Sequence, residues 1–188
     1  MKIAITGHTQ GIGLATTTLL KEQGHEIIGY SKTNGWDFTQ KECRREFIDA
    51  LDEQKFDCFI NNAYPYKQYK NMEGFVQVEL LNLAWLLWEK DPSKKIIVVG
   101  SQTSDTVKNY YHPYSIHKKA LDDTCKQLRN TRSWPHIINI RPTYVDTISM
   151  SHLKNVNKST TDEVAKLILW ALDNPIKILD LTFAAYEK

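Results

Sequence analysis

Tyr114 and Lys118 lie four positions apart, in a segment whose pattern predicts a helix. Pro113 suits the first helical position, and residues four apart share one face of a helix. Tyrosine is a weak acid with an ordinary pKa of about 10, and a nearby cation favours its phenolate and brings that pKa toward neutrality. The pair therefore has the chemistry of an acid–base catalyst supported by a cation. An ordinary exposed pair of helix residues would show the same spacing.

Ser101 is the third residue with suitable chemistry. It follows a strand predicted over residues 95–100 and precedes Tyr114 by 13 residues. The carboxyl end of a parallel strand faces the crevice in which ligands of open α/β sheets bind. A hydroxyl there can donate a hydrogen bond to an oxygen on which negative charge develops. A capped strand end is the alternative explanation.

The beginning of the chain predicts a phosphate-binding turn. Residues 3–5 form a short apolar run of strand type, and Gly7, Gly11 and Gly13 follow it before a helical pattern starts. The free N–H groups and the dipole of a helix N-terminus attract anions, and glycine lets the backbone approach a pyrophosphate. No Gly-Lys-Ser/Thr follows, which excludes a P-loop. A tight turn without a ligand remains the alternative for the glycines alone.

The remaining pattern alternates helices and strands and predicts one α/β domain over residues 1–188. The expected fold is a Rossmann-like, doubly wound parallel sheet of six or seven strands with helices on both faces. Residues 33–38 are too few for a second helix and a full third strand, so both are reduced. Thr39 with Glu42 and Thr160 with Glu163 match the capping box that begins a helix. We expect helices over 14–23, from 39, over 75–90, from 112 and over 160–172, and strands over 26–30, 56–60, 137–140 and 178–183.

The end of the second strand bears on the choice of cofactor. Dinucleotide folds that bind NAD place a carboxylate there to accept hydrogen bonds from the ribose hydroxyls. This chain has Ser31 and Lys32 instead. A cation suits a 2′-phosphate, which indicates NADP, although Lys32 can also be read as a solvated surface lysine. Asp37 is expected beside the adenine as the remnant of a strand end, and an exposed turn explains the same residues.

Composition narrows the class of partner. A net charge of +2 and 24% charged residues give no reason to expect nucleic acid, so a small molecule is expected. Cys43, Cys58 and Cys125 have no paired or metal-ligand spacing and are read as reduced thiols. No signal peptide or membrane span is recognised, and we expect a cytoplasmic protein.

Residues 75–90 predict a helix that is apolar on nearly every side. Such a helix needs a second partner besides the sheet. Trp85 and Trp88 would form a large apolar patch on a monomer. We therefore expect a homodimer or higher homo-oligomer.

Four elements together resemble the short-chain dehydrogenase/reductase family, and the likeness covers almost the whole chain. They are TGHTQGIG at 6–13, NNAY at 61–64, Ser101 after a buried strand, and Tyr-x-x-x-Lys at 114–118. The resemblance implies hydride transfer between NADP, or NAD, and a small carbonyl or alcohol substrate. Tyr114 would be the acid or base, Lys118 would lower its pKa and hold the nicotinamide ribose, and Ser101 would polarise the carbonyl. The implied cofactor contacts are Gly7, Thr9, Gly11, Ile12, Gly13, Ser31, Lys32, Asp37, Asn62, Ala63, Tyr64, Tyr114, Lys118, Pro142 and Thr143.

The chain also departs from the family. The family often has an Asn in the helix before the serine strand, and here Gln77 or Val78 stands at that spacing, so that role is unassigned. The chain is shorter than usual and lacks a large insertion after Thr143, which predicts a small or open substrate pocket. Residues 147–157 could fold over a ligand, and residues 64–70 are read as a pocket edge or a solvated loop. The alternative function is a nucleotide-binding sensor or scaffold without redox activity.

Overall fold

The structure is a computed structural model, and it describes residues 1–65, 72–106 and 109–186. The described chain forms a parallel sheet of six strands in the order β2-β1-β3-β4-β5-β6. This confirms the predicted fold class. The strands are β1 (Lys2–Thr6), β2 (Glu26–Tyr30), β3 (Cys58–Asn61), β4 (Lys95–Val99), β5 (His136–Pro142) and β6 (Asp180–Phe183).

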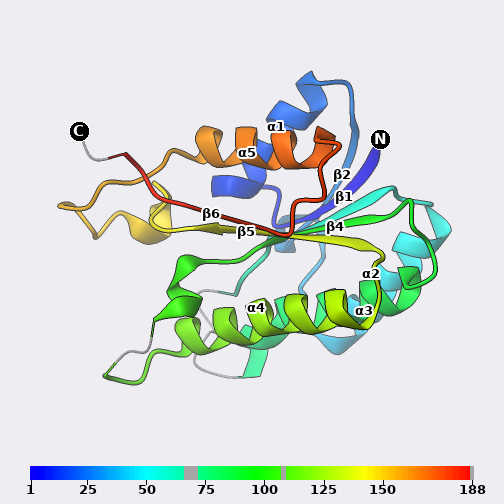
Figure 1. Ribbon diagram of the computed structural model, residues 1–188, viewed down its shortest axis with the longest axis horizontal. Coiled ribbons are helices and arrows are strands. Elements are labelled where there is room, and N and C mark those ends of the chain that lie inside the picture. Colours follow the sequence, from blue (N-terminus) through cyan, green and yellow to red (C-terminus); the bar gives the residue numbers. More distant parts are fainter. Residues whose placement is uncertain (66–71, 107–108, 187–188) are drawn as a thin grey trace.

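Helices cover both faces of the sheet (Figure 1). Helices α1 (Gly11–Glu22) and α5 (Thr161–Asp173) lie on one face. The other face carries α2 (Lys41–Glu53), α3 (Val76–Trp88) and α4 (Pro113–Thr131). Within the described ranges, four short 3₁₀ turns connect these elements: η1 (Lys32–Asn34), η2 (Met72–Phe75), η3 (Gln102–Asp105) and η4 (Ile148–Met150).

Alternation along the strands divides the core into two layers. Ala4, Phe59 and Ile96 face α2, α3 and α4, whereas their strand neighbours Ile3 and Ile60 face α1 and α5. Strands that are buried on both faces need apolar side chains at nearly every position, as the sequence provides. Because all strands run in parallel, their carboxyl ends meet at one edge, where the candidate functional residues follow them.

An aromatic cluster occupies the place of the missing third strand. Trp36 packs edge-on against Tyr30 with ring centroids 4.9 Å apart, and Phe38 packs against Phe47 at 5.3 Å. The segment around Asp37 is a turn, so the expected remnant of a strand is wrong. Aromatic burial replaces the sheet pairing that a third strand would give.

One of the two predicted capping boxes is present. Thr160 Oγ1 accepts a hydrogen bond from Glu163 N at 3.1 Å, and Glu163 Oε2 accepts one from Thr160 N at 2.7 Å. The box predicted at Thr39 is wrong, because α2 begins at Lys41 and its N-cap is Gln40, which makes no side-chain cap hydrogen bond. Thr39 lies one residue before the N-cap, and its Oγ1 donates to Asp37 Oδ1 at 2.7 Å.

The expected exposure of the α3 tryptophans is also wrong. Trp85 and Trp88 are 7% and 5% exposed within the single chain. Helix α3 packs against both α2 and α4 as well as the sheet, so its extra partners come from the same chain. Leu86 is 59% exposed and remains on the surface. Self-association stays a prediction, but the exposed tryptophans from which it was inferred are buried in the single chain.

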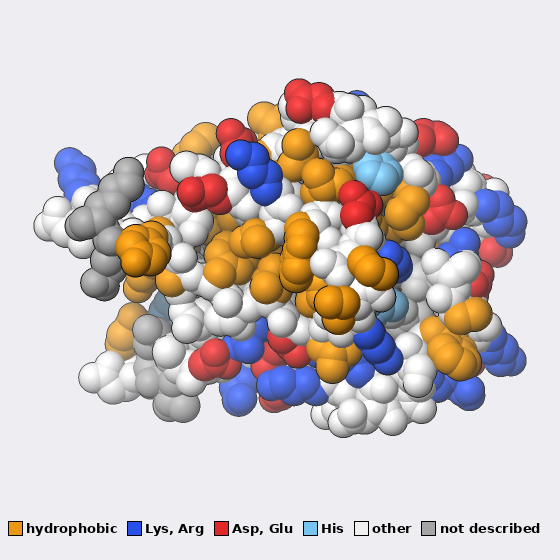
Figure 2. All heavy atoms as spheres, turned by 45° about the horizontal axis from the view of Figure 1, so that its top comes forward, with side chains coloured by type: hydrophobic (Ala, Val, Ile, Leu, Met, Phe, Trp, Pro, Cys, Tyr) orange, Lys and Arg blue, Asp and Glu red, His pale blue; other side chains and the backbone are white. Residues whose placement is uncertain are grey.

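The opposite face of the molecule carries exposed hydrophobic residues. Figure 2 shows hydrophobic side chains gathered across this face, on the side of α1 and α5. Leu14 of α1 and Trp170 of α5 are both 49% exposed. No helix within the described ranges is long and apolar enough to span a membrane.

Candidate active site

The turn after β1 has the geometry of an anion cradle. Gly7 and Gly11 have φ values of +70° and +54°, which favour glycine. A Cβ on Gly13 would lie 2.1 Å from the Gly7 carbonyl oxygen, so α1 can begin this close to β1 only with glycine there. The N-cap residue Gln10 makes no side-chain hydrogen bond to the first amides of α1. These amides are therefore not capped by that side chain, as an anion site requires.

Residues at the end of β3 hold this turn in place. Asn62 Nδ2 donates to the carbonyl oxygens of Thr6 at 3.0 Å and Gly7 at 3.1 Å. Thr6 Oγ1 accepts from the backbone N–H groups of Asn62 and Ala63, both at 3.1 Å. The strand order reverses between β1 and β3, where ligands of such sheets bind. The Asn62 side chain thus braces the crevice through both carbonyls.

Lys32 and Asp37, both predicted to contact the cofactor, pair with each other. Lys32 Nζ lies 2.9 Å from Asp37 Oδ2, with the two side chains 57% and 34% exposed. Burial would raise the pKa of Asp37, but hydrogen bonds from Lys32 and Thr39 outweigh it and lower that pKa. Ser31 Oγ shares a hydrogen bond with Thr33 Oγ1 at 2.8 Å. A 2′-phosphate here would meet a lysine that already has a carboxylate partner.

Lys118 is buried on the inner side of α4 and is 3% exposed. Its Nζ donates to Gln77 Oε1 at 2.6 Å and to the Val99 carbonyl oxygen at 2.7 Å. Burial lowers the pKa of Lys118 to about 7. The lysine is thus fixed beside the end of β4 and titrates near neutrality.

Gln77 is held as firmly as the lysine. Its Nε2 donates to the Asn61 carbonyl oxygen at 2.9 Å, and Asn61 Nδ2 donates back to the Gln77 carbonyl oxygen at 2.8 Å. Gln77 is 2% exposed. Of the two residues that the spacing offered, Gln77 is therefore the one that reaches Lys118.

Two tyrosine rings flank the lysine. Lys118 Nζ lies 5.6 Å from the ring centroid of Tyr114 and 5.3 Å from that of Tyr64, within the range of cation–π attraction. The two rings meet edge-on with centroids 5.0 Å apart. Tyr64 Oη is also 2.8 Å from Nδ1 of His117. Burial and the Lys118 charge lower the pKa of His117, which favours its neutral form at neutral pH.

Ser101 lies buried at the end of β4 and begins η3. Its Oγ accepts a hydrogen bond from Thr103 N at 3.2 Å, which leaves the hydroxyl hydrogen able to donate to another acceptor. Ser115, the residue after Tyr114, donates through Oγ to the Thr103 carbonyl oxygen at 3.0 Å. The turn of Ser101 is therefore tied to the first turn of α4, where Tyr114 lies.

The segment after β5 lies against the glycine turn at the edge of the crevice. Thr143 N donates to the Phe183 carbonyl oxygen at 3.0 Å, which fixes the turn that follows Pro142. Thr147 lies close enough to Gly11 that a Cβ there would be 3.4 Å from Thr147 Cγ2. Residues 148–150 form η4, so the predicted irregular loop contains one ordered turn.

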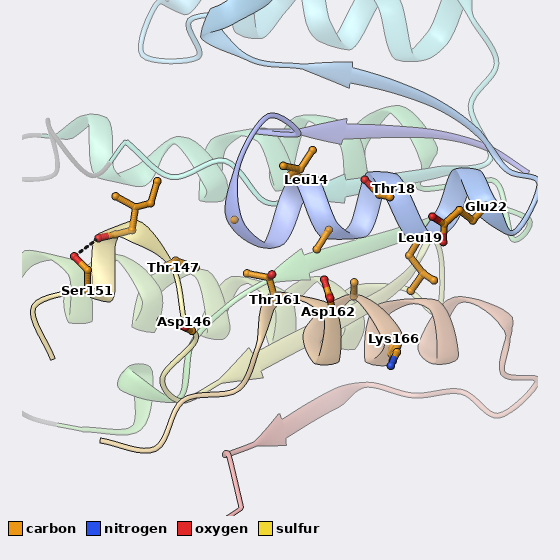
Figure 3. A pocket seen from close by; sticks show the side chains of 14 residues that line it. Leu14, Thr18, Leu19, Glu22, Asp146, Thr147, Ser151, Thr161, Asp162 and Lys166 are labelled. Atoms are coloured by element: carbon orange, nitrogen blue, oxygen red, sulfur yellow. Dashed lines mark hydrogen bonds between the residues drawn. The ribbon is translucent and has the colours of Figure 1, made fainter. Parts of the chain in front are cut away.

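A groove of about 830 Å³ lies between α1 and α5, and this segment lines one end of it through residues 146–148 and Ser151. Figure 3 shows Leu14, Thr18 and Glu22 on one wall and Asp162 and Lys166 on the other. Its lining includes Gly11 but none of Ser101, Tyr114 and Lys118. The groove therefore shares Gly11 and Thr147 with the glycine-turn end of the candidate site and lies apart from Ser101, Tyr114 and Lys118.

Cys58 and Cys125 are buried thiols that stay protonated at neutral pH. The three cysteines are free thiols, and burial raises the pKa of Cys58 and Cys125 to about 12. Within the described ranges no cluster of His, Cys, Asp or Glu could hold a metal ion.

The structure brings the predicted catalytic residues to one edge of the sheet, with the glycine turn and residues 62–64 beside them. It adds His117 and Thr147, which sequence reasoning missed. His117 lies between Ile116 and Lys118 on α4 and belongs to no recognised motif, and Thr147 was grouped with a loop. Part of the predicted pocket edge, residues 66–70, lies outside the described ranges.

No family model matches the sequence, and no curated protein matches it significantly. Solved structures do match. A 3-alpha-hydroxysteroid dehydrogenase from Pseudomonas sp. B-0831, complexed with NADH, aligns with a TM-score of 0.79 at 19% identity over 98% of this chain and 95% of that chain. An alcohol dehydrogenase from Thermococcus sibiricus, complexed with 5-hydroxy-NADP, gives 0.78 at 20% identity over 97% and 96%.

A short chain dehydrogenase from Burkholderia cenocepacia J2315, in complex with NADP, aligns with a TM-score of 0.77 at 17% identity over 96% of this chain and 87% of that chain. The three proteins thus share the architecture over nearly the whole of this chain, despite low identity. The chain therefore has the fold of the short-chain dehydrogenases.

Proposed function

We propose that this chain is a single-domain, nicotinamide-dependent oxidoreductase that interconverts a small carbonyl compound and its alcohol. The observation that carries the proposal is the position of Lys118. A lysine that is 3% exposed has its Nζ 5.6 Å from the ring centroid of Tyr114, on the helix that adjoins the turn of Ser101. Burying an amine is costly, and perturbed groups of this kind cluster at functional sites.

The residues at the crevice fit a dinucleotide. The uncapped start of α1 would hold the pyrophosphate through the amides near Gly11, Ile12 and Gly13, with Thr9 in the same turn. Ala63, Pro142 and Thr143 would line the nicotinamide half. The bound nicotinamide supplies or accepts the hydride. All of these groups follow the carboxyl ends of parallel strands, where this class of sheet binds its ligands.

Ser101, Tyr114 and Lys118 would each have a separate role in the reaction at the substrate oxygen. Ser101 donates a hydrogen bond to the substrate oxygen, which gains negative charge as the carbonyl is reduced. Tyr114 gives its phenolic proton to that oxygen, and it takes the proton back in the oxidative direction. Charged Lys118 favours the phenolate of Tyr114 and so brings its pKa toward neutrality.

NADP is the preferred cofactor in this proposal. The end of β2 presents Lys32 where a carboxylate would favour NAD, and a cation attracts the 2′-phosphate. Asp37 opposes this preference because it already pairs with Lys32 at 2.9 Å. We therefore expect a moderate preference, in which the phosphate shares the lysine with Asp37.

A nucleotide-binding protein without redox activity is the second candidate. It is favoured by one observation: Lys118 donates to Gln77 and Val99 and has a pKa lowered to about 7. Above that pH the ligand-free lysine is mostly neutral and does little to stabilise a phenolate. The two candidates share cofactor binding and differ in turnover.

The test combines a binding measurement with a turnover measurement. Calorimetric titration with NADPH and NADH establishes binding, and loss of absorbance at 340 nm is then followed with a panel of ketones and aldehydes, with the alcohols in reverse. The oxidoreductase proposal predicts binding together with turnover of at least one compound. Binding without turnover across the panel favours the second candidate, and no binding of either nucleotide overturns both.

A further inference from the structure

Arg141 carries a charge into the interior beside the candidate active site. It lies near the end of β5, just before Pro142, and its side chain is 10% exposed. Burying a guanidinium is costly unless partners compensate its charge and its donors. The partners of Arg141 therefore indicate what the residue holds together.

The guanidinium reaches two different elements. Its Nη2 donates to Ser104 Oγ at 2.9 Å and also pairs with Asp105 Oδ1, both on η3. Its Nε lies 3.7 Å from Asp122 Oδ1 on α4, one turn beyond Lys118. Arg141 thus joins the turn that begins at Ser101 to the helix that carries the candidate acid.

A direct chain of hydrogen bonds leads from Arg141 to Ser101. Ser104 Oγ accepts from Arg141 and donates to the Ser101 carbonyl oxygen at 2.9 Å. The Ser104 amide donates to the same carbonyl oxygen at 3.2 Å. The backbone of Ser101 is therefore held from the side of β5 through one intervening hydroxyl.

The other end of the connection is equally fixed. Asp122 is 4% exposed, and it accepts from Asn139 Nδ2 at 3.0 Å and from Lys126 Nζ at 2.6 Å. A carboxylate with several donors keeps one position. The Asp122 carboxylate therefore has a fixed position on α4, and its pairing with Arg141 holds the guanidinium relative to that helix.

We propose that Arg141 is a positioning residue that fixes Ser101 relative to Tyr114. The proposal rests on the proposed function, because it concerns the residues that would act on the substrate oxygen. A shift of about 1 Å in such residues can lower a rate by about 100-fold, so a rigid connection between η3 and α4 has a direct catalytic consequence. Lysine in place of Arg141 keeps the charge but loses the planar fork that spans both elements.

The chain offers a matched control in Arg129. Its side chain is 11% exposed, it pairs with Asp180 at 2.8 Å, and it also connects α4 to the sheet, at the far end of the helix. Arg141→Lys and Arg129→Lys therefore remove comparable contacts. Ser104→Ala is a second test that removes only the bridging hydroxyl and keeps Arg141 paired with Asp105.

The kinetic test measures kcat and the cofactor dissociation constant for these variants. Arg141→Lys should lower kcat by about 10-fold or more while cofactor affinity stays within about twofold, and Ser104→Ala should follow in the same direction. Arg129→Lys should leave kcat within about twofold. In a Ser101→Ala background, Arg141→Lys should cost less than about twofold, because the residue through which it acts is gone. Additive losses, or equal losses for Arg141→Lys and Arg129→Lys, overturn the proposal.

A second readout does not depend on turnover. The amides of Ser104 and Thr106 donate to the carbonyl oxygens of Ser101 and Thr103, both at 3.2 Å. Their hydrogen exchange should accelerate by about 10-fold or more in Arg141→Lys and stay unchanged in Arg129→Lys. Unchanged exchange in Arg141→Lys contradicts the connection itself. Absence of turnover in the unmodified protein, with faster exchange in Arg141→Lys, contradicts the proposed function and leaves the connection supported.

Discussion

Lys118 Nζ lies 2.6 Å from Gln77 Oε1, and both residues are almost completely buried. The amide oxygen is a neutral acceptor, so it satisfies a donor of the ammonium without compensating the charge. This explains how a lysine can remain in the interior with its pKa lowered to about 7. The charge state of Lys118 is therefore set first by its burial, and Gln77 Oε1 and the Val99 carbonyl oxygen are neutral acceptors that hold its ammonium group.

Gln77 should control the pH profile of the reaction. Gln77→Ala removes an acceptor of the charged amine and should lower the pKa of Lys118 further, so activity is lost at a lower pH on the basic side. Gln77→Glu places a carboxylate against the amine and should raise that pKa. The profile of kcat/KM against pH measures both shifts. Identical basic limbs in the two variants and the unmodified protein would refute the coupling.

The buried lysine also predicts a pH dependence of stability. The folded-state pKa of Lys118 is lowered from 10.5 to about 7, so between these values the unfolded chain binds more protons and the free energy of unfolding rises with pH. The slope attributable to Lys118 should be about 1 kcal/mol per pH unit near pH 8. Below about pH 7 both states are protonated, and the full cost of burying the charge remains.

Urea unfolding at several pH values between about 7.5 and 8.5 measures this slope. Lys118→Met is the comparison variant, because it keeps an unbranched side chain and removes the titrating group. Its slope should be smaller by the amount assigned to Lys118. Above about pH 9 the buried thiols Cys58 and Cys125 act in the opposite direction, since they keep protons that the unfolded chain releases. Equal slopes for the two proteins would show that Lys118 titrates normally.

Cofactor choice should depend on the pair formed by Lys32 and Asp37. Lys32→Ala should weaken NADPH binding by about 10-fold and leave NADH nearly unchanged, because only NADPH carries the 2′-phosphate. Asp37→Asn removes the competing carboxylate and should strengthen NADPH binding. Both effects should shrink as salt rises, since Lys32 is exposed to solvent and Asp37 is only half-buried. Calorimetric titration decides this, and tighter binding of NADH than NADPH by the unmodified protein would contradict the preference.

The sequence predicted the elements with strong patterns. The apolar strands, the glycine turn and the proline at the start of α4 each carry a local physical cause, and all three are present. The spacing from Ser101 to Lys118 also predicted which residues gather at one edge, because parallel strands bring their carboxyl ends together.

What the sequence left open depended on contacts between distant residues. Gln77 reaches Lys118 across 41 positions, and only the packing of α3 against α4 distinguishes it from Val78. Trp85 and Trp88 looked exposed because periodicity does not reveal that α2 and α4 flank α3. Asp37 forms an ion pair with Lys32 and accepts a hydrogen bond from Thr39, because the compact turn that replaces the third strand brings these residues together. The local sequence pattern does not indicate which of several possible hydrogen-bond or ion-pair partners a side chain will take.

In the proposed function, Tyr114 transfers the proton in a nicotinamide-dependent reaction. The most direct measurement is kcat of Tyr114→Phe beside the unmodified protein, with Tyr186→Phe as a control because Tyr186 is 92% exposed at the far end of the chain. We predict a loss of about 10² to 10⁴-fold for Tyr114→Phe with NADPH binding retained, and no loss for Tyr186→Phe. A Tyr114→Phe variant that binds NADPH and turns over at the unmodified rate would contradict the account.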